Sequence, residues 1–162
     1  MGARNFGEMG VNLQKICTRL LANENLLKLL EFADGDPLSH RDLTKEEAQS
    51  KLHDLVRVKP IMGAFEDSRS RIAVYVPNGH SISGNNEYRV VVVHVDVFVP
   101  TTTWLIKDSN LRPFAIMGEI QSSLDNKTIN GLGKMECGDF DLTLLTEEMS
   151  VYRMYFRITD YA

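Results

Sequence analysis

Two side chains that could perform acid–base or metal chemistry stand inside the most apolar run of the chain, "YRVVVVHVDVFVP", residues 88–100. His94 and Asp96 are two residues apart, so in a strand they share one face, roughly 7 Å from each other. A histidine and a carboxylate at this distance suit general acid–base catalysis or metal binding. Either function needs a third group, a nucleophile or another ligand, and no spacing in the sequence supplies one.

The same spacing also predicts structural contacts. Valines occupy one face of the run at positions 91, 93, 95, 97 and 99, and His94 and Asp96 belong to the other, more polar face. Arg153 and Arg157 lie on the polar face of the last predicted strand and are natural partners, across strands or between subunits. We favour this structural interpretation. A small hydrolase that uses His94 and Asp96 is the less favoured alternative.

Other motifs also favour packing over chemistry. The segment Gly131–Met135, "GLGKM", lacks the glycine spacing and the hydroxyl residue of a phosphate loop, which predicts a turn before a strand. Cys17 falls on the apolar stripe of a predicted helix, which indicates a core thiol. No nucleophile-elbow or zinc-protease motif occurs in the sequence. We therefore expect no catalytic residue, cofactor or metal ligand, and a protein that is not an enzyme.

The segment between the valine run and the next helix offers two candidate interface residues. Trp104 is the sole tryptophan of the chain, and Arg112 follows in the same connection. Trp104 either folds back onto the core of its own domain or, together with Arg112, anchors a partner. The second alternative rests on the enrichment of aromatic residues and arginine at binding hot spots.

Helices are expected first along the chain, and strands later. Apolar residues recur at helical spacing over 11–33, where Asn23 can cap a second segment. A short helix is expected over 43–56, with Thr44 and Glu47 in capping-box positions. Two strands follow, joined by a long loop over 76–88. A helix at 111–126, in which Pro113 suits the first turn, then precedes a final hairpin over 139–159.

This order predicts an α+β fold with a mostly antiparallel, four-stranded sheet flanked by helices. No linker of low complexity divides the chain, so we expect a single domain over 1–162. Its N-terminal helices should occupy about 11–56, and its sheet and central helix about 70–160.

Composition limits the classes of partner. The 162 residues carry a formal net charge of −4 with a pI near 5.6, which does not suggest nucleic-acid binding. The two cysteines have no metal-binding spacing, which is typical of a reducing compartment. The first ten residues lack the apolar core of a secretory signal. No run approaches the roughly 18 apolar residues of a spanning helix. A soluble, intracellular protein without membrane partners is expected.

The order of elements resembles a known family. An N-terminal helix "ICTRLLANENLLKLLEF" precedes a strand, a long loop and the strand "RVVVVHVDVFV". The helix "LRPFAIMGEIQSSL", the turn "NGLGKM" and the hairpin strands "FDLTLLT" and "YRMYFRIT" complete the pattern. This layout is similar to that of the tail-terminator and neck (head-to-tail joining) proteins of tailed bacteriophages.

The resemblance implies a structural role without catalysis. It predicts a homo-oligomeric ring, a homohexamer, that caps the tail tube at the head–tail joint of the virion, after assembly in the host cytoplasm. Its partners would be other copies of itself, the tail tube protein and a head-completion, connector or stopper protein. Genomic DNA would only pass through the channel, where the acidic side chains of Asp139 and Asp141 could face the lumen.

A different class of function remains open beside this one. A non-viral module that binds a peptide or protein along a sheet edge would explain the same strands. It predicts an exposed, unpaired edge strand in the monomer.

Overall fold

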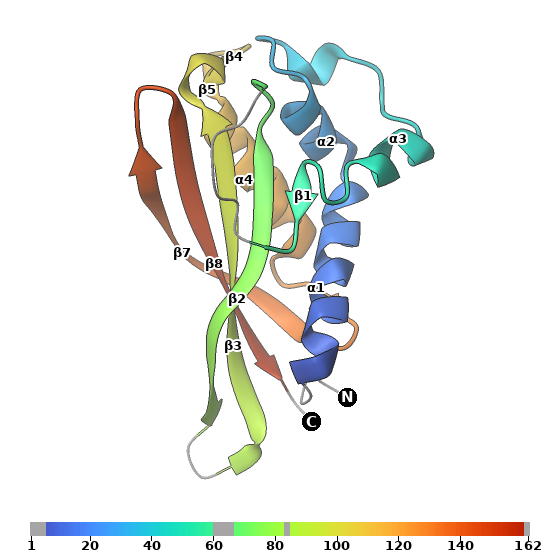
Figure 1. Ribbon diagram of the computed structural model, residues 1–162, viewed down its shortest axis with the longest axis vertical. Coiled ribbons are helices and arrows are strands. Elements are labelled where there is room, and N and C mark those ends of the chain that lie inside the picture. The colour runs from blue at the N-terminus through green and yellow to red at the C-terminus, as the bar shows by residue number, and fades with distance from the viewer. Residues whose placement is uncertain (1–5, 60–66, 83–84, 161–162) are drawn as a thin grey trace.

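The computed structural model describes residues 6–59, 67–82 and 85–160, and Figure 1 shows how they are arranged. Helices and strands follow in the order α1 (Phe6–Leu21), α2 (Glu24–Glu31), η1 (Pro37–Ser39), α3 (Lys45–Ser50), β1 (Val56–Arg57), β2 (Arg71–Ile82), β3 (Asn85–Pro100), η2 (Thr101–Thr103), β4 (Leu105–Ile106), β5 (Asn110–Leu111), α4 (Arg112–Leu124), β6 (Thr128–Ile129), β7 (Gly133–Leu145) and β8 (Met149–Asp160).

One sheet dominates the fold and curls into a half-barrel (Figure 1). It has six strands in the order β1-β2-β3-β8-β7-β6, in which β1 runs parallel to β2 and the other pairs are antiparallel. The α+β class is therefore as expected, but the prediction of a four-stranded, mostly antiparallel sheet is wrong. The added strands β1 and β6 have two residues each, too few to carry a period-two pattern in the sequence.

The core lies between the sheet and a layer formed by α1, α2 and α4. Valines 91, 93, 95, 97 and 99 of β3 point into it and are almost fully buried. They pack with Ile16 and Leu20 of α1, Ile120 of α4 and Phe156 of β8. Cys17 is also fully buried, and this burial raises the pKa of its thiol to about 12, as befits a packing residue.

Local signals set the helix ends. The side chain of Asn23 accepts a hydrogen bond from the backbone N–H of Leu26 at 3.0 Å and separates α2 from α1, as predicted. Thr44 and Glu47 form the predicted capping box of α3. That helix ends at Ser50, well before the predicted residue 56. The backbone turns left-handed at His53, with φ of 68°, and then enters β1.

The β2–β3 hairpin extends beyond the end of α1 (Figure 1). A long loop was expected from residue 76, but the strands remain paired as far as Ile82 and Asn85. The Pro77–Gly79 segment makes no turn, because the register shift between Tyr75 and Asn78 accommodates it within the strand. Among the described residues, no helix is long and apolar enough to cross a membrane.

Candidate functional site

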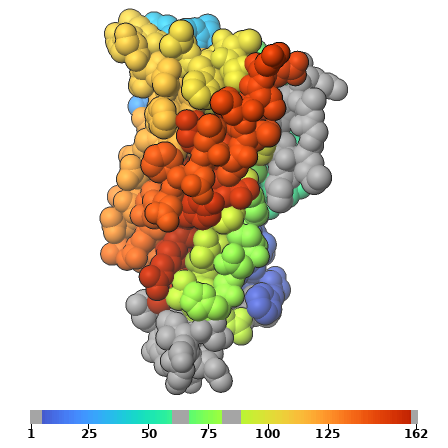
Figure 2. All heavy atoms as spheres, turned by 90° about the vertical axis from the view of Figure 1, so that its left-hand side faces the viewer, coloured from blue at the N-terminus to red at the C-terminus, as the bar shows by residue number. Residues whose placement is uncertain are grey.

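A polar cluster occupies the face of the sheet that points away from the helices. It comprises Tyr75, His94, Asp96, Arg153 and Tyr155, from three adjacent strands. Tyr75 and Tyr155 lie opposite His94 on either side, and Arg153 lies opposite Asp96. Figure 2 looks toward this side of the molecule, where no described helix covers the strands.

Asp96 is the anion at the centre of the cluster and is 4% exposed. Arg153 Nε donates to Asp96 Oδ1 at 2.8 Å, and the Tyr75 hydroxyl donates to Asp96 Oδ2 at 2.7 Å. Arg153 Nη2 lies 2.7 Å from the same tyrosine oxygen and closes the network. The hydrogen bond to Asp96 is the main cause that raises the pKa of Arg153, so its guanidinium stays charged.

His94 takes no part in these hydrogen bonds. Its ring meets Tyr75 and Tyr155 edge-on, with centroid distances of 5.4 and 4.7 Å, and its buried Nδ1 has no hydrogen-bond partner. Burial and the nearby positive charge of Arg153 lower the pKa of His94, against the smaller opposite effect of Asp96. The ring therefore packs as a neutral aromatic group at neutral pH.

This geometry does not form a hydrolytic site. Asp96 is engaged by Arg153 and Tyr75 and does not orient the imidazole of His94, and neither residue lines any of the described grooves. Over the described parts of the chain, no group of three or more histidine, cysteine, aspartate or glutamate side chains could hold a metal ion. The contact of Asp96 with Arg153 is the cross-strand pairing that the strand register predicts.

The cluster makes a testable prediction at alkaline pH. Burial and the hydrogen bond to Asp96 raise the pKa of Tyr75 from 10.0 to about 12. The folded protein therefore keeps this proton between pH 10 and 12 while the unfolded chain loses it, so stability should fall as pH rises through this window. In urea unfolding at several pH values, Tyr75→Phe should show a shallower loss of stability than wild type. If stability fell equally steeply with pH in the two proteins, the raised pKa of Tyr75 would be contradicted.

Three further predicted residues lie on or beside this face. Arg157 is exposed, between Val92 and Glu136 in the ladder, away from Asp96. Asp141 is exposed opposite Arg153 and accepts a hydrogen bond from the Tyr155 hydroxyl at 2.8 Å. Asp139 is also exposed and falls within the register shift of β7 between Cys137 and Phe140.

Arg112 lies in the interior of the protomer, 1% exposed. Its guanidinium donates to the carbonyl oxygens of Thr103, Leu29 and Phe32, each at 2.8 Å, and to that of Asp34. Three of these carbonyls belong to the end of α2 and the residues after it, where a cation is favoured by the helix dipole. Arg112 thus ties α4 to α2 inside the chain, which leaves little of it for a partner to contact.

Trp104 is half-buried and packs against the core of its own chain. Its indole Nε1 donates to Ser150 Oγ at 2.9 Å, and its ring centroid lies 6.3 Å from that of Tyr152. Of the two alternatives for this residue, the inward-folded position is the one observed within the protomer.

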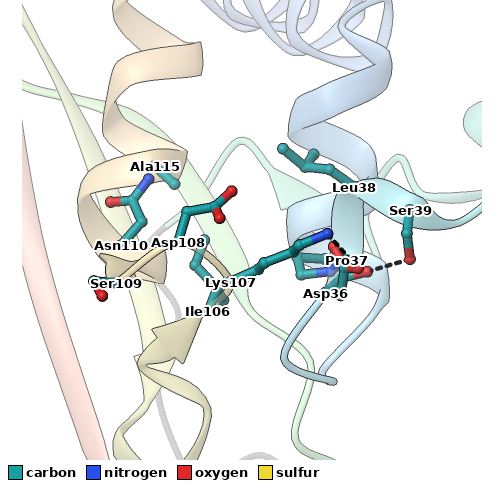
Figure 3. Close-up of a pocket in the computed structure, with 10 residues that line it drawn as sticks. All are labelled: Asp36, Pro37, Leu38, Ser39, Ile106, Lys107, Asp108, Ser109, Asn110 and Ala115. Carbon is teal, nitrogen blue, oxygen red and sulfur yellow. Dashed lines mark hydrogen bonds and ion pairs between the residues drawn. The ribbon is translucent and has the colours of Figure 1, made fainter.

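A wide groove next to η1 contains several polar side chains (Figure 3). Lys107 Nζ lies 3.6 Å from Asp36 Oδ2. The backbone N–H of Lys107 also donates to the carbonyl oxygen of Gly35 at 2.7 Å, so the segment around Lys107 is linked to the segment before η1. The hydroxyl of Ser39 donates to the carbonyl oxygen of Asp36 at 2.8 Å, so no base activates it. The groove holds polar groups without a catalytic arrangement.

Four exposed apolar side chains of β7 were not predicted from the sequence. Phe140, Leu142, Leu144 and Leu145 of β7 are 43–58% exposed, and we call these four side chains the apolar ridge. The register shift after Leu142 turns Leu144 to the face of Val151, whereas the other three share the face of Met154. Only the early part of β7, at Met135, is fully buried, because the helix layer does not cover the rest of the strand. The one signal in the sequence for such a surface was the high apolar content of the second half of this strand.

A comparison with models of protein families places the chain in one of them. No curated protein matches the chain. The sequence model of the YomW family matches residues 23–158, which include every strand, apart from the last two residues of β8, and all helices except α1. The chain therefore belongs to the YomW family, which indicates a phage-related protein.

Proposed function

We propose that the protein is a structural subunit of the phage neck, a tail terminator that assembles as a homo-oligomeric ring between the tail tube and the head-completion proteins. The phage-related family supports the setting, and the order of elements supports the neck. The observation that carries the proposal is the apolar ridge on an open sheet edge. A soluble monomer rarely leaves such a surface uncovered, whereas a subunit covers it on assembly.

Two features of the fold fit this role. The β2–β3 hairpin projects beyond the helices, where it can reach a neighbouring component of the joint (Figure 1). Within the polar cluster, Tyr75, Asp96 and Arg153 are engaged in hydrogen bonds to one another, which suits a scaffold rather than a reactive site. Other copies of the chain, the tail tube protein and a connector or stopper protein would be its partners, and DNA would pass through the ring.

The test is to locate the chain in the particle. Virions that carry the full-length chain with a small tag should bind a gold-labelled antibody at the head–tail joint in electron micrographs. Particles made without the chain should contain heads and tails that do not join. A label at the tail tip or inside the head, or intact particles without the chain, would refute the proposal.

A second candidate is favoured by the same edge strand. A module that binds a peptide by strand addition needs an unpaired edge, and β7 offers one beyond its short contact with β6. This candidate predicts a protein that stays monomeric at the highest soluble concentration and binds an extended peptide. Light scattering separates the two, because the ring subunit should associate with itself.

A further inference from the structure

The strand β2 changes its environment halfway along its length. Its first part, Arg71–Val74, is buried, whereas the side chains of residues 77–80 are exposed. Between these parts the register of β2 on β3 shifts after Tyr75, and Pro77 has no backbone N–H to donate to the ladder. We call Asn78–Ile82 the outer segment of β2. The irregularity separates it from the buried part of the strand.

In the described structure, the outer segment is held mainly by its pairing with β3. On the other side of β2, the described residues place one strand, β1, and it pairs only with Ile72 and Ala73. On the helix side, a groove separates this part of β2 from the start of α1, where Phe6 and Met9 line it. A strand with so little packing opens locally at a lower free energy than a core strand does.

Tyr75 stands at the boundary between the two parts of β2 and packs on His94. These two residues form the last regular pair before the register shift, and their ring centroids are 5.4 Å apart. On its other side, the ring of His94 has its centroid 4.7 Å from that of Tyr155 in β8. The row of three rings therefore ties β2 to the middle of the sheet at the point where the outer segment begins.

The ring of His94 fits this row in its neutral form. It is 8% exposed, and its buried Nδ1 has no hydrogen-bond partner, so an N–H at this atom would be buried without an acceptor. The carboxylate of Asp96 is already bonded to Arg153 and Tyr75. Among the described residues, the titratable or charged side chains that face the ring are Tyr75 of β2, Asp96 of β3, and Arg153, Tyr155 and Arg157 of β8, with Asp141 of β7 behind Tyr155.

We propose that His94 holds the outer segment of β2 on the sheet only while its ring is neutral, and that uptake of a proton releases this segment. The inference goes beyond the neck role and does not rest on it. In the released state the ring is open to water and takes up a proton as an ordinary histidine does, so acid favours release. The closed segment should have its full stability above about pH 6.5 and lose stability as the pH falls below this value. The first part of β2 stays in place, because Ile72 and Val74 belong to the core.

Amide hydrogen exchange of the full-length protein, followed residue by residue by NMR, measures the release. After correction for the intrinsic effect of pH, the protected amides of the outer segment should exchange several-fold faster at about pH 5 than at about pH 7.5. Those of Arg71–Val74 should keep their protection. His94→Phe keeps a ring between the two tyrosines but takes up no proton, so its outer segment should no longer respond to pH. His94→Ala removes the ring, so its outer segment should exchange fast at both pH values.

His80→Gln is the matched control, because His80 is an exposed histidine within the outer segment itself. This variant should respond to pH as wild type does. Equal protection of the wild-type outer segment at the two pH values would overturn the inference. So would a pH response that persists in His94→Phe or disappears in His80→Gln. The comparison between the two parts of β2 is made within wild type, so it decides the question even if a variant does not fold. The neck role is tested separately, by the micrographs.

Discussion

Arg112→Met should lower the free energy of unfolding by several kcal/mol, the largest loss we expect from any single side chain described here. The guanidinium of Arg112 donates to four carbonyl oxygens, and methionine donates to none. Each buried polar group left without a partner costs roughly 1 to 3 kcal/mol. Arg112→Lys should fall between the two, because an ammonium group cannot reproduce the planar fork of donors. Urea unfolding of the three proteins measures the series.

Arg157→Met is the matched control for this series. Arg157 is exposed on β8, so its replacement should change stability by no more than roughly 0.5 kcal/mol. If Arg112→Met were no less stable than Arg157→Met, the four carbonyl contacts would contribute nothing measurable. A loss of stability with unchanged assembly would assign Arg112 to the interior of the subunit rather than to its contacts.

Arg153→Leu should have the second largest effect, because it leaves the carboxylate of Asp96 buried without its cation. Removing one partner of a buried ion pair costs roughly 3 to 5 kcal/mol. The side chain of Arg153 is 28% exposed, so solvent screens the pair and the loss should lie toward the lower end. Chemical denaturation of wild type and variant gives the difference.

The companion variant Asp96→Leu/Arg153→Leu should recover part of that stability. With both charges gone, no buried carboxylate remains unpaired, so the double variant should be more stable than Arg153→Leu alone. If the stability loss of the double variant equalled the sum of the losses in Asp96→Leu and Arg153→Leu, the two residues would not interact. Arg157→Leu, on the same face of the same strand, controls for the loss of an arginine from β8.

The sequence predicts the long elements of this fold well, because their patterns are long enough to read. The valine alternation of β3 identifies the strand and its buried face, and Asn23 marks the break between α1 and α2. Elements of two residues, such as β1 and β6, have no readable period. The stop of α3 depends on a left-handed backbone at His53, for which the residue type gives only a weak signal.

The candidate site is less visible in the sequence, since it depends on which surfaces remain uncovered. The register places Asp96 opposite Arg153, a contact that the alternating pattern already favours. The burial of Arg112 could not be predicted from its position at the start of a helix, because three of its four partners lie about 80 residues away, near α2. The exposure of Phe140 and Leu142 likewise depends on where the helix layer ends.

The position of β8 has a consequence for how the protein is made. This strand comes last among the elements in the described part of the chain, yet it lies in the middle of the sheet, between β3 and β7. A ribosome therefore releases the helices and the β2–β3 hairpin before the strand that joins them to β7 exists. One edge of β3 therefore stays unpaired until β8 has been synthesised, and pairing between segments so far apart in sequence forms slowly. Completion of the sheet thus depends on the synthesis of residues 149–160, which delays any subunit contact that needs the finished sheet.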